Sequence, residues 1–208
     1  MTDFRLRKQK DKELNPRLWP LGEGVVFTMP RLDRLAELAP KEIDLLHHLA
    51  TTGIDGDIAN LGHSEGGSAI VLSMALRNTH PGFMIHSVDL FSDKKQWKRI
   101  RRNLVRFGVR DMIELHRGET IMWADKFRTR KHKFSGVFVD ADHSYEGVRR
   151  DSEDWRRLLL VGGWIAFHDT NQDFSHRAIQ DSIVKDKRFE EDKSLHVHSI
   201  RVFRRTEQ

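Results

Sequence analysis

The sequence predicts an α/β domain in which a mostly parallel sheet carries helices on both faces. Two observations support this prediction. From residue 57 onward, short apolar runs alternate regularly with amphipathic stretches, and the 208 residues suit a single hydrophobic core. Strands that alternate with helices favour parallel pairing through right-handed crossovers. Because ligands of such doubly wound sheets bind at the carboxyl ends of the strands, the residues at those ends decide the function.

The expected elements follow the apolar periodicity of the chain. Residues 1–39 are predicted to form an N-terminal extension, weakly structured over about its first 30 residues, before a domain spanning residues 40–208. A helix is expected to begin at Pro40, a residue suited to a first turn, and to end near Gly53. Strands are expected at residues 57–61, 83–90, 112–116, 136–139, 164–167 and 196–203. Further helices are expected at residues 69–77, 94–107, 120–127, 146–160 and 177–184. The polar–apolar alternation of the last strand indicates antiparallel pairing.

Composition excludes several classes of site. The chain has no cysteine, which excludes disulfides, thiolate zinc sites and cysteine nucleophiles. The basic start of the sequence lacks the apolar run of a signal peptide. No apolar stretch approaches the roughly 20 residues of a membrane span. A cytoplasmic protein with no membrane partner is therefore expected.

The charge distribution raises a nucleic-acid alternative. The net charge is +5, and basic residues cluster at residues 5–12, 94–102 and 127–133. Such clusters could hold a polyanion. Acidic residues are interleaved elsewhere in the chain, and we interpret the clusters as solvated helix faces and loop tips. Nucleic acid is accordingly not the expected partner.

Three strand ends suggest a ribonucleoside site. The glycine-rich turn 62–68 opens a helix, where backbone N–H groups can meet an anion, although an ordinary tight turn fits as well. Asp89 ends the second strand, where a carboxylate can accept from both ribose hydroxyls or, alternatively, cap a turn. Gly118 and Glu119 follow the third strand, close to an expected adenine or simply at a helix start. Together these features favour a ribonucleoside whose anionic end lies against the first of these helices.

The fourth and fifth strand ends carry the reactive groups. Asp140, Asp142 and His143 follow one strand, and His168 and Asp169 follow the next. Adjacent parallel strands would bring these carboxylates and imidazoles together, which suggests metal binding or acid–base chemistry. The structural alternative is that Asp142 caps a helix and Asp169 shapes a turn.

These residues form a pattern that resembles class I S-adenosylmethionine (SAM)-dependent methyltransferases over about residues 40–205. The more specific part is the run Val139-Asp140-Ala141-Asp142-His143-Ser144-Tyr145-Glu146, followed by Asp151, Trp155, Leu159, Gly162-Gly163 and His168-Asp169. The nearest subgroup contains macrocin-type sugar O-methyltransferases and cephalosporin-hydroxylase-like proteins.

The resemblance implies a fold, a cofactor and site residues. The fold would be a Rossmann-like sheet of seven strands, mostly parallel, with an antiparallel C-terminal hairpin. The residues implied to bind SAM are Gly62, Gly66 and Ser68 at the methionine part, Asp89 at the ribose, and Gly118 and Glu119 at the adenine. In related metal-dependent O-methyltransferases, a divalent cation such as magnesium would be held by Asp140, His168 and Asp169.

Two positions depart from the family pattern. Asn60 stands where an acidic residue is common, and His168 stands where the magnesium enzymes usually have a carboxylate. Magnesium prefers oxygen ligands, whereas imidazole suits zinc, iron or nickel. The expected catalytic residues are Asp140, His143 and His168, with either histidine as general base.

The predicted activity is SAM-dependent methylation of a hydroxyl on a small molecule or sugar. Ionising such a hydroxyl at pH 7 costs roughly 12 kcal/mol, more than the 3 to 5 kcal/mol that a general base supplies, which favours a metal. One alternative is an RNA or other nucleic-acid methyltransferase. However, Asp140 is followed by Ala141-Asp142 rather than by the Pro-Pro-aromatic run of amino-methylating enzymes. The other alternative is a different nucleotide-binding protein, such as a dehydrogenase or a non-catalytic module. The acceptor and the oligomeric state, including a homo-oligomer, are left open.

Overall fold

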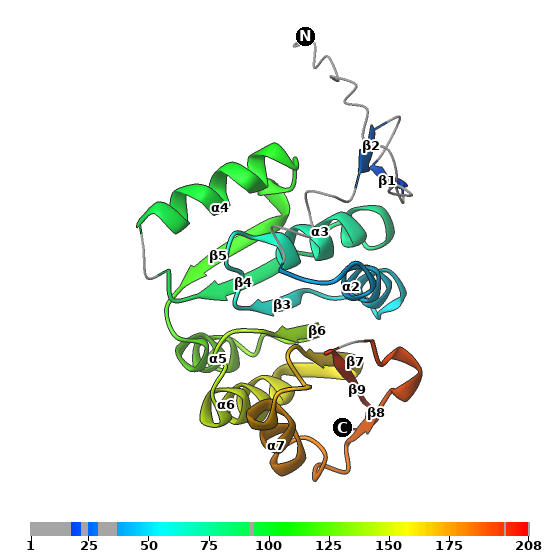
Figure 1. Cartoon of the computed structure of the whole chain (residues 1–208), viewed down its shortest axis with the longest axis vertical. Helices are drawn as coiled ribbons and strands as arrows, with labels where there is room; N and C mark the ends of the chain where they lie inside the picture. The colour runs from blue at the N-terminus through cyan, green and yellow to red at the C-terminus, as the bar shows by residue number, and fades with distance from the viewer. Residues whose placement is uncertain (1–17, 22–24, 29–36, 92–93, 198, 208) are drawn as a thin grey trace.

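The computed structural model describes residues 18–21, 25–28, 37–91, 94–197 and 199–207. Its main feature is a seven-stranded sheet between two layers of helices (Figure 1). The strands are β3 (Ile58–Leu61), β4 (Ile85–Asp89), β5 (Ile113–Arg117), β6 (Phe134–Val139), β7 (Leu159–Phe167), β8 (Phe189–Glu191) and β9 (Arg201–Arg205). The helices are α2 (Pro40–Thr52), α3 (Gly67–Thr79), α4 (Lys94–Arg106), α5 (Thr120–Thr129), α6 (Tyr145–Trp155) and α7 (Asp173–Asp181).

The strand order is β5-β4-β3-β6-β7-β9-β8. The first five strands in this order are parallel, and β9 pairs antiparallel with both β7 and β8. The predicted Rossmann-like arrangement, mostly parallel with antiparallel C-terminal strands, is therefore confirmed. The chain runs outward from β3 to β4 and β5, then returns to place β6 on the other side of β3. This reversal puts the ends of β3 and β6 side by side at a topological switch point, where doubly wound sheets bind ligands.

Each face of the sheet carries its own apolar core. Helices α2, α3 and α4 pack on one face, and α5, α6 and α7 cover the other (Figure 1). Trp164 in β7 is fully buried on the first side, and Trp155 at the end of α6 is fully buried on the second. Because both faces are covered, the inner strands β3 and β6 are buried along their whole length.

The structure differs from the sequence prediction in three elements. The helix expected at residues 146–160 ends at Trp155, and a 3₁₀ turn leads directly into β7. Leu159 pairs with Phe134 rather than continuing the helix. An irregularity in the pairing of β6 with β7 accommodates Gly162, which has φ +83°. The resemblance implied a seventh strand, but the sequence pattern assigned it no residues, and it is the three-residue strand β8. In the N-terminal extension, β1 (Leu18–Leu21) and β2 (Val25–Thr28) pair as an antiparallel hairpin, where weak structure was expected.

A buried carboxyl group on α6 makes the stability of the fold depend on pH. Asp151 is 3% exposed, and its Oδ1 accepts a hydrogen bond from the hydroxyl of Thr120 on α5. Its Oδ2 is buried and has no hydrogen-bond partner among the described residues. Burial raises the pKa of Asp151 to about 7, although the bond from Thr120 acts in the opposite direction. The group is thus largely protonated in the folded protein at pH 6.

We predict that the wild type loses stability as the pH rises from about 4 to 7 and that Asp151→Asn does not. In this window the unfolded chain releases the Asp151 proton and the folded protein keeps it, so rising pH favours unfolding, by at most about 4 kcal/mol. Urea unfolding at several pH values measures the effect. Asp111→Asn, at a carboxylate whose side chain is 85% exposed, is the control, and its free energy of unfolding should depend on pH as in the wild type. The same pH dependence in Asp151→Asn would contradict a raised pKa of Asp151.

Candidate active site

The turn after β3 needs glycine at two positions. Gly62 has φ +76°, and a β-carbon there would overlap the carbonyl oxygen of Asp140 at the end of β6. Gly66 has φ +97° and immediately precedes α3, and a β-carbon there would lie 3.0 Å from Ile100 of α4. Ser68 is buried in the first turn of α3. The turn is therefore compressed at the switch point, against the neighbouring strand end and against α4.

Two buried polar atoms under this turn lack hydrogen-bond partners among the described residues. Asn60 Nδ2 donates to the carbonyl of Gly62 at 2.9 Å and to Ser87 Oγ at 3.1 Å. Ser87 Oγ lies 2.8 Å from Nδ1 of His63, and burial lowers the pKa of His63 to about 4, so the ring is neutral at pH 7. Within the described part of the chain, Asn60 Oδ1 and His63 Nε2 make no hydrogen bond. Because the Ser87 hydroxyl can donate to His63 Nδ1, the proton of the neutral ring lies on Nε2. The two atoms without hydrogen bonds are therefore an acceptor, Asn60 Oδ1, and an N–H donor, His63 Nε2.

Asp89 is held rigidly at the end of β4. Its Oδ2 accepts from the backbone N–H of His63 at 3.1 Å, and its Oδ1 accepts from that of Phe91 at 2.9 Å. The Asp89 side chain is 18% exposed, so its remaining lone pairs can reach a ligand. Gly118 donates its N–H to the carbonyl of Asp89 at 3.0 Å, which places Gly118 and the exposed Glu119 beside the same strand end.

The structure brings together the reactive groups predicted after β6 and β7. Asp140 Oδ1 lies 3.1 Å from Nδ1 of His168 and 3.5 Å from Nε2 of His143. The other ring nitrogen of His143 lies 3.2 Å from Asp169 Oδ2. Asp169 itself has φ +53°, a left-handed conformation that aspartate tolerates better than most residues. Asp142 instead accepts from the backbone N–H of Ser144, and Ser144 rather than Asp142 caps α6 by accepting from the N–H of Gly147.

Glu42 on α2 belongs to this site and was missed in the sequence. It is 3% exposed, and its Oε2 lies 3.5 Å from Nε2 of His168. Its carboxylate also accepts from the N–H of Ala39 and from both the N–H and the hydroxyl of Ser199. Burial opposes ionisation of Glu42, but these hydrogen bonds, with that from His168 the largest, lower its pKa to about 2. The only signal in the sequence was one acidic residue on the apolar, buried face of a helix.

Two carboxylates therefore enclose His168. Burial would lower its pKa, but the hydrogen bonds with Asp140 and Glu42 and the negative charges around it raise the pKa to about 10. At neutral pH His168 is an imidazolium with both nitrogens protonated, and in that state it can neither accept a proton nor bind a cation. Hydrogen bonding to Asp140 also raises the pKa of His143, which is about half exposed. The geometry thus favours His143 over His168 as general base.

The same geometry bears on the metal prediction. The potential ligand atoms of Asp140, His143 and Asp169 all lie within 4.8 Å of one another. This group replaces His168 of the predicted ligand set with His143. Two carboxylates and one imidazole suit manganese, iron or zinc better than magnesium. Metal binding by Asp140, His168 and Asp169 stays a prediction, and His143 is the better third ligand.

Comparison with known proteins assigns the family. A family model described as a methyltransferase domain matches residues 59–170, more than half of the chain. The chain belongs to this methyltransferase domain family. The matched region begins in β3 of the methyltransferase domain and ends just after Asp169, so it contains both the glycine turn and the Asp140 cluster. No curated protein matches the chain.

Solved structures share the fold of this methyltransferase domain at low sequence identity. An O-methyltransferase from Bacillus cereus in complex with SAH has 18% identity over 84% of this chain and 86% of its own, with a TM-score of 0.67. The O-methyltransferase TomG from Streptomyces achromogenes, in complex with SAM, has 15% identity over 86% and 90%, with a TM-score of 0.68. CalS11, a TDP-rhamnose 3′-O-methyltransferase, has 14% identity over 84% and 91%, with a TM-score of 0.63. Among the described residues, no helix is long and apolar enough to cross a membrane.

Proposed function

We propose that the protein is a SAM-dependent O-methyltransferase that acts on a hydroxyl group of a small molecule or sugar. One observation carries the proposal: a compressed glycine turn and a fixed carboxylate, Asp89, adjoin a cluster of carboxylates and imidazoles around Asp140. The first part suits a nucleoside cofactor, and the second suits an acceptor that must lose a proton. The solved structures named above, which include SAM and SAH complexes and a sugar O-methyltransferase, support this assignment.

The residues around the glycine turn fit the cofactor. The amino-acid end of SAM offers ammonium donors and carboxylate acceptors, which complement the unpaired Asn60 Oδ1 and the His63 Nε2–H. Leaving such buried groups unpaired costs about 1–3 kcal/mol each, so a ligand that pairs them gains affinity. This chemistry explains why asparagine serves where an acidic residue is common. Gly62, Gly66 and Ser68 would line the same end of SAM, Asp89 the ribose, and Gly118 with Glu119 the adenine.

The acceptor would bind beside the Asp140 cluster. SAM supplies an electrophilic methyl group, so the protein must orient the acceptor oxygen and remove its proton. In one version His143 takes this proton, while Asp140 and Asp169 hold the ring and balance its charge. In the other, Asp140, His143 and Asp169 hold a divalent cation that lowers the pKa of the hydroxyl. The protonated His168, anchored by Glu42, orients Asp140 in both.

The test of the function is release of S-adenosylhomocysteine (SAH) over a panel of sugars, phenols, amines and RNA. We expect turnover with hydroxyl acceptors. Turnover confined to RNA, together with binding that weakens steeply with salt, would favour the nucleic-acid alternative instead. The panel is run with and without chelator: inhibition selects the version with a cation, and full activity selects the version in which His143 is the base.

We predict that Asp89→Ala weakens SAH binding at least tenfold. The substitution removes a charged acceptor from two ribose hydroxyls, worth about 1.5–3 kcal/mol, and it also releases the N–H groups of His63 and Phe91. Calorimetric titration with SAH measures the change. Asp173→Ala, at an aspartate on α7 whose side chain is 85% exposed, is the control and should bind SAH like the wild type. Unchanged affinity in a folded Asp89→Ala protein would overturn the placement of the cofactor.

A further inference from the structure

A second group of imidazoles and carboxylates lies on β4 and β5, on the α5 side of the sheet. In the parallel register His86 of β4 pairs with Glu114 of β5, and Val88 pairs with His116. Glu114 and His116 are two residues apart, so they share a face of the strand. His86 packs against Phe127 of α5, which identifies that face. Two imidazoles and one carboxylate therefore meet at the edge of the sheet, two strands away from the Asp140 cluster.

We propose that His86, Glu114 and His116 form a binding site for a transition-metal cation of the zinc class. His86 Nδ1 lies 3.0 Å from His116 Nε2 and 3.4 Å from Glu114 Oε2, and His116 Nε2 lies 3.8 Å from the same oxygen. Bond lengths of 2.0–2.2 Å in a tetrahedral zinc site separate its ligand atoms by about 3.3–3.5 Å. The three atoms thus already form a triangle of nearly the required size.

The neighbours of His86 orient it for this role. Asp57, just before β3, lies with its Oδ2 3.3 Å from His86 Nε2, and its Oδ1 accepts from the N–H of Met84 at 2.8 Å. A carboxylate beside one ring nitrogen keeps the proton there and leaves the lone pair on the other, as in carboxylate–histidine–metal triads. The free lone pair is then on Nδ1, the atom that faces His116 and Glu114.

The charge and exposure of the group also suit a cation. Burial lowers the pKa of His116 to about 4, helped by the neighbouring His86 ring and by the positive charges of Arg130 and Lys126, so its ring is neutral at pH 7. The Arg130 and Lys126 cations oppose a metal, while the carboxylates of Glu114 and Asp57 offset their charge. The His86 and His116 side chains are 8% and 9% exposed, whereas Glu114 is 56% exposed. The cation can therefore enter at Glu114, where the fourth coordination position faces solvent.

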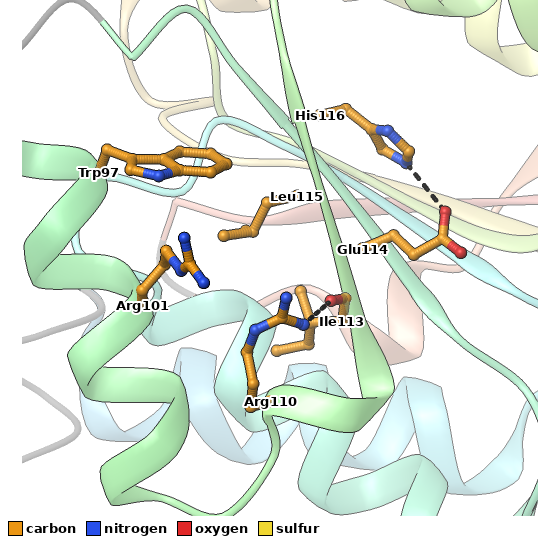
Figure 2. A pocket seen from close by; sticks show the side chains of 7 residues that line it. All are labelled: Trp97, Arg101, Arg110, Ile113, Glu114, Leu115 and His116. Atoms are coloured by element: carbon orange, nitrogen blue, oxygen red, sulfur yellow. Dashed lines mark hydrogen bonds and ion pairs between the residues drawn. The ribbon is translucent and has the colours of Figure 1, made fainter. Parts of the chain in front are cut away.

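Figure 2 shows the pocket that Glu114 and His116 line. Glu114 and His116 project from β5 toward each other, and both line a pocket of about 410 Å³ that continues around the edge strand to Trp97 and Arg101 of α4. A cation there would tie the edge strand β5 to β4. His86 precedes Asp89 by three residues, about 10 Å along the strand, so the metal would be separate from the proposed cofactor contacts.

Cobalt(II) titration of the chelator-treated, dialysed full chain tests the proposal. The Asp140 cluster is a second candidate site, so the reference protein is the double variant His143→Ala, Asp169→Ala. We expect this reference to bind one Co²⁺ with the intense visible absorption of tetrahedral coordination, and zinc to displace it. Glu114→Gln in the same background should weaken binding at least tenfold, and His116→Gln should abolish it. Because Glu114 is exposed, its substitution should leave the fold intact. Glu190→Gln, at an exposed glutamate on β8, is the matched control.

Three outcomes overturn the proposal: no Co²⁺ or Zn²⁺ binding by the reference protein, equal binding by the reference protein and Glu114→Gln, or loss of binding in Glu190→Gln. Absence of metal binding by the reference protein would mean that the His86 and His116 rings are held together by a hydrogen bond alone. Because the reference protein lacks the candidate base His143 and its neighbour Asp169, none of these results depends on methyl transfer, so the metal site and the enzymatic function fail or stand separately.

Discussion

His143→Ala is expected to lower the rate of methyl transfer by about 10² to 10⁴ while SAH affinity stays nearly unchanged. His143 lies between Asp140 and Asp169 at the proposed acceptor position, whereas the cofactor contacts lie at Gly62–Ser68 and Asp89. Single-turnover rates and calorimetry with SAH separate the two effects. His176→Ala, at an exposed histidine on α7, is the matched control and should retain wild-type turnover.

The companion variants decide whether a cation takes part. With a bound cation, Asp169→Ala should reproduce the effect of chelator, and Mg²⁺, Mn²⁺ and Zn²⁺ should differ in restoring the wild type. Without one, chelator changes nothing and His143→Ala alone removes the base. Full activity of Asp140→Ala, His143→Ala and Asp169→Ala, each measured with chelator present, would eliminate both versions and move the chemistry away from this cluster.

Gly62→Ala is expected to destabilise the protein by about 2–6 kcal/mol and to abolish measurable SAH binding. The new β-carbon would overlap the carbonyl oxygen of Asp140, and alanine disfavours φ +76°; each effect costs about 1–3 kcal/mol. For a domain of this size, the melting temperature should fall on the order of 10 °C. Cofactor affinity is lost because the turn must move away from β6, and the N–H groups of the turn move with it.

Gly108→Ala is the control that separates the cost of the strained backbone conformation from the cost of the steric overlap with Asp140. Gly108 has φ +65°, close to that of Gly62, but a β-carbon there meets nothing within 4 Å. This control should therefore show the cost of the backbone conformation alone and should bind SAH normally. Equal melting temperatures for the two variants would show that the turn is not pressed against β6 and would remove the structural basis for the compressed cofactor turn.

Much of the fold was predictable because it depends on local patterns. Apolar runs such as 136–139 and 58–61 can bury only as inner strands, and the intervening amphipathic segments can bury only one face as helices. Where a local pattern fits two structures, prediction failed. The run Leu158–Val161 suits a helix end as well as a strand, and only pairing of Leu159 with Phe134 decides between them.

The sequence by itself determined the order of the elements and which polar residues follow each strand, because both depend on neighbours along the chain. The protonation state of those residues was decided only by the tertiary structure. Glu42 and His168 are 126 positions apart, and together with Asp140 this contact keeps His168 protonated at neutral pH and leaves His143 as the candidate base. The edge pair of strands likewise brings His86 to Glu114 and His116. A pKa and a ligand triangle depend on distances through space, and strand pairing and helix docking set those distances.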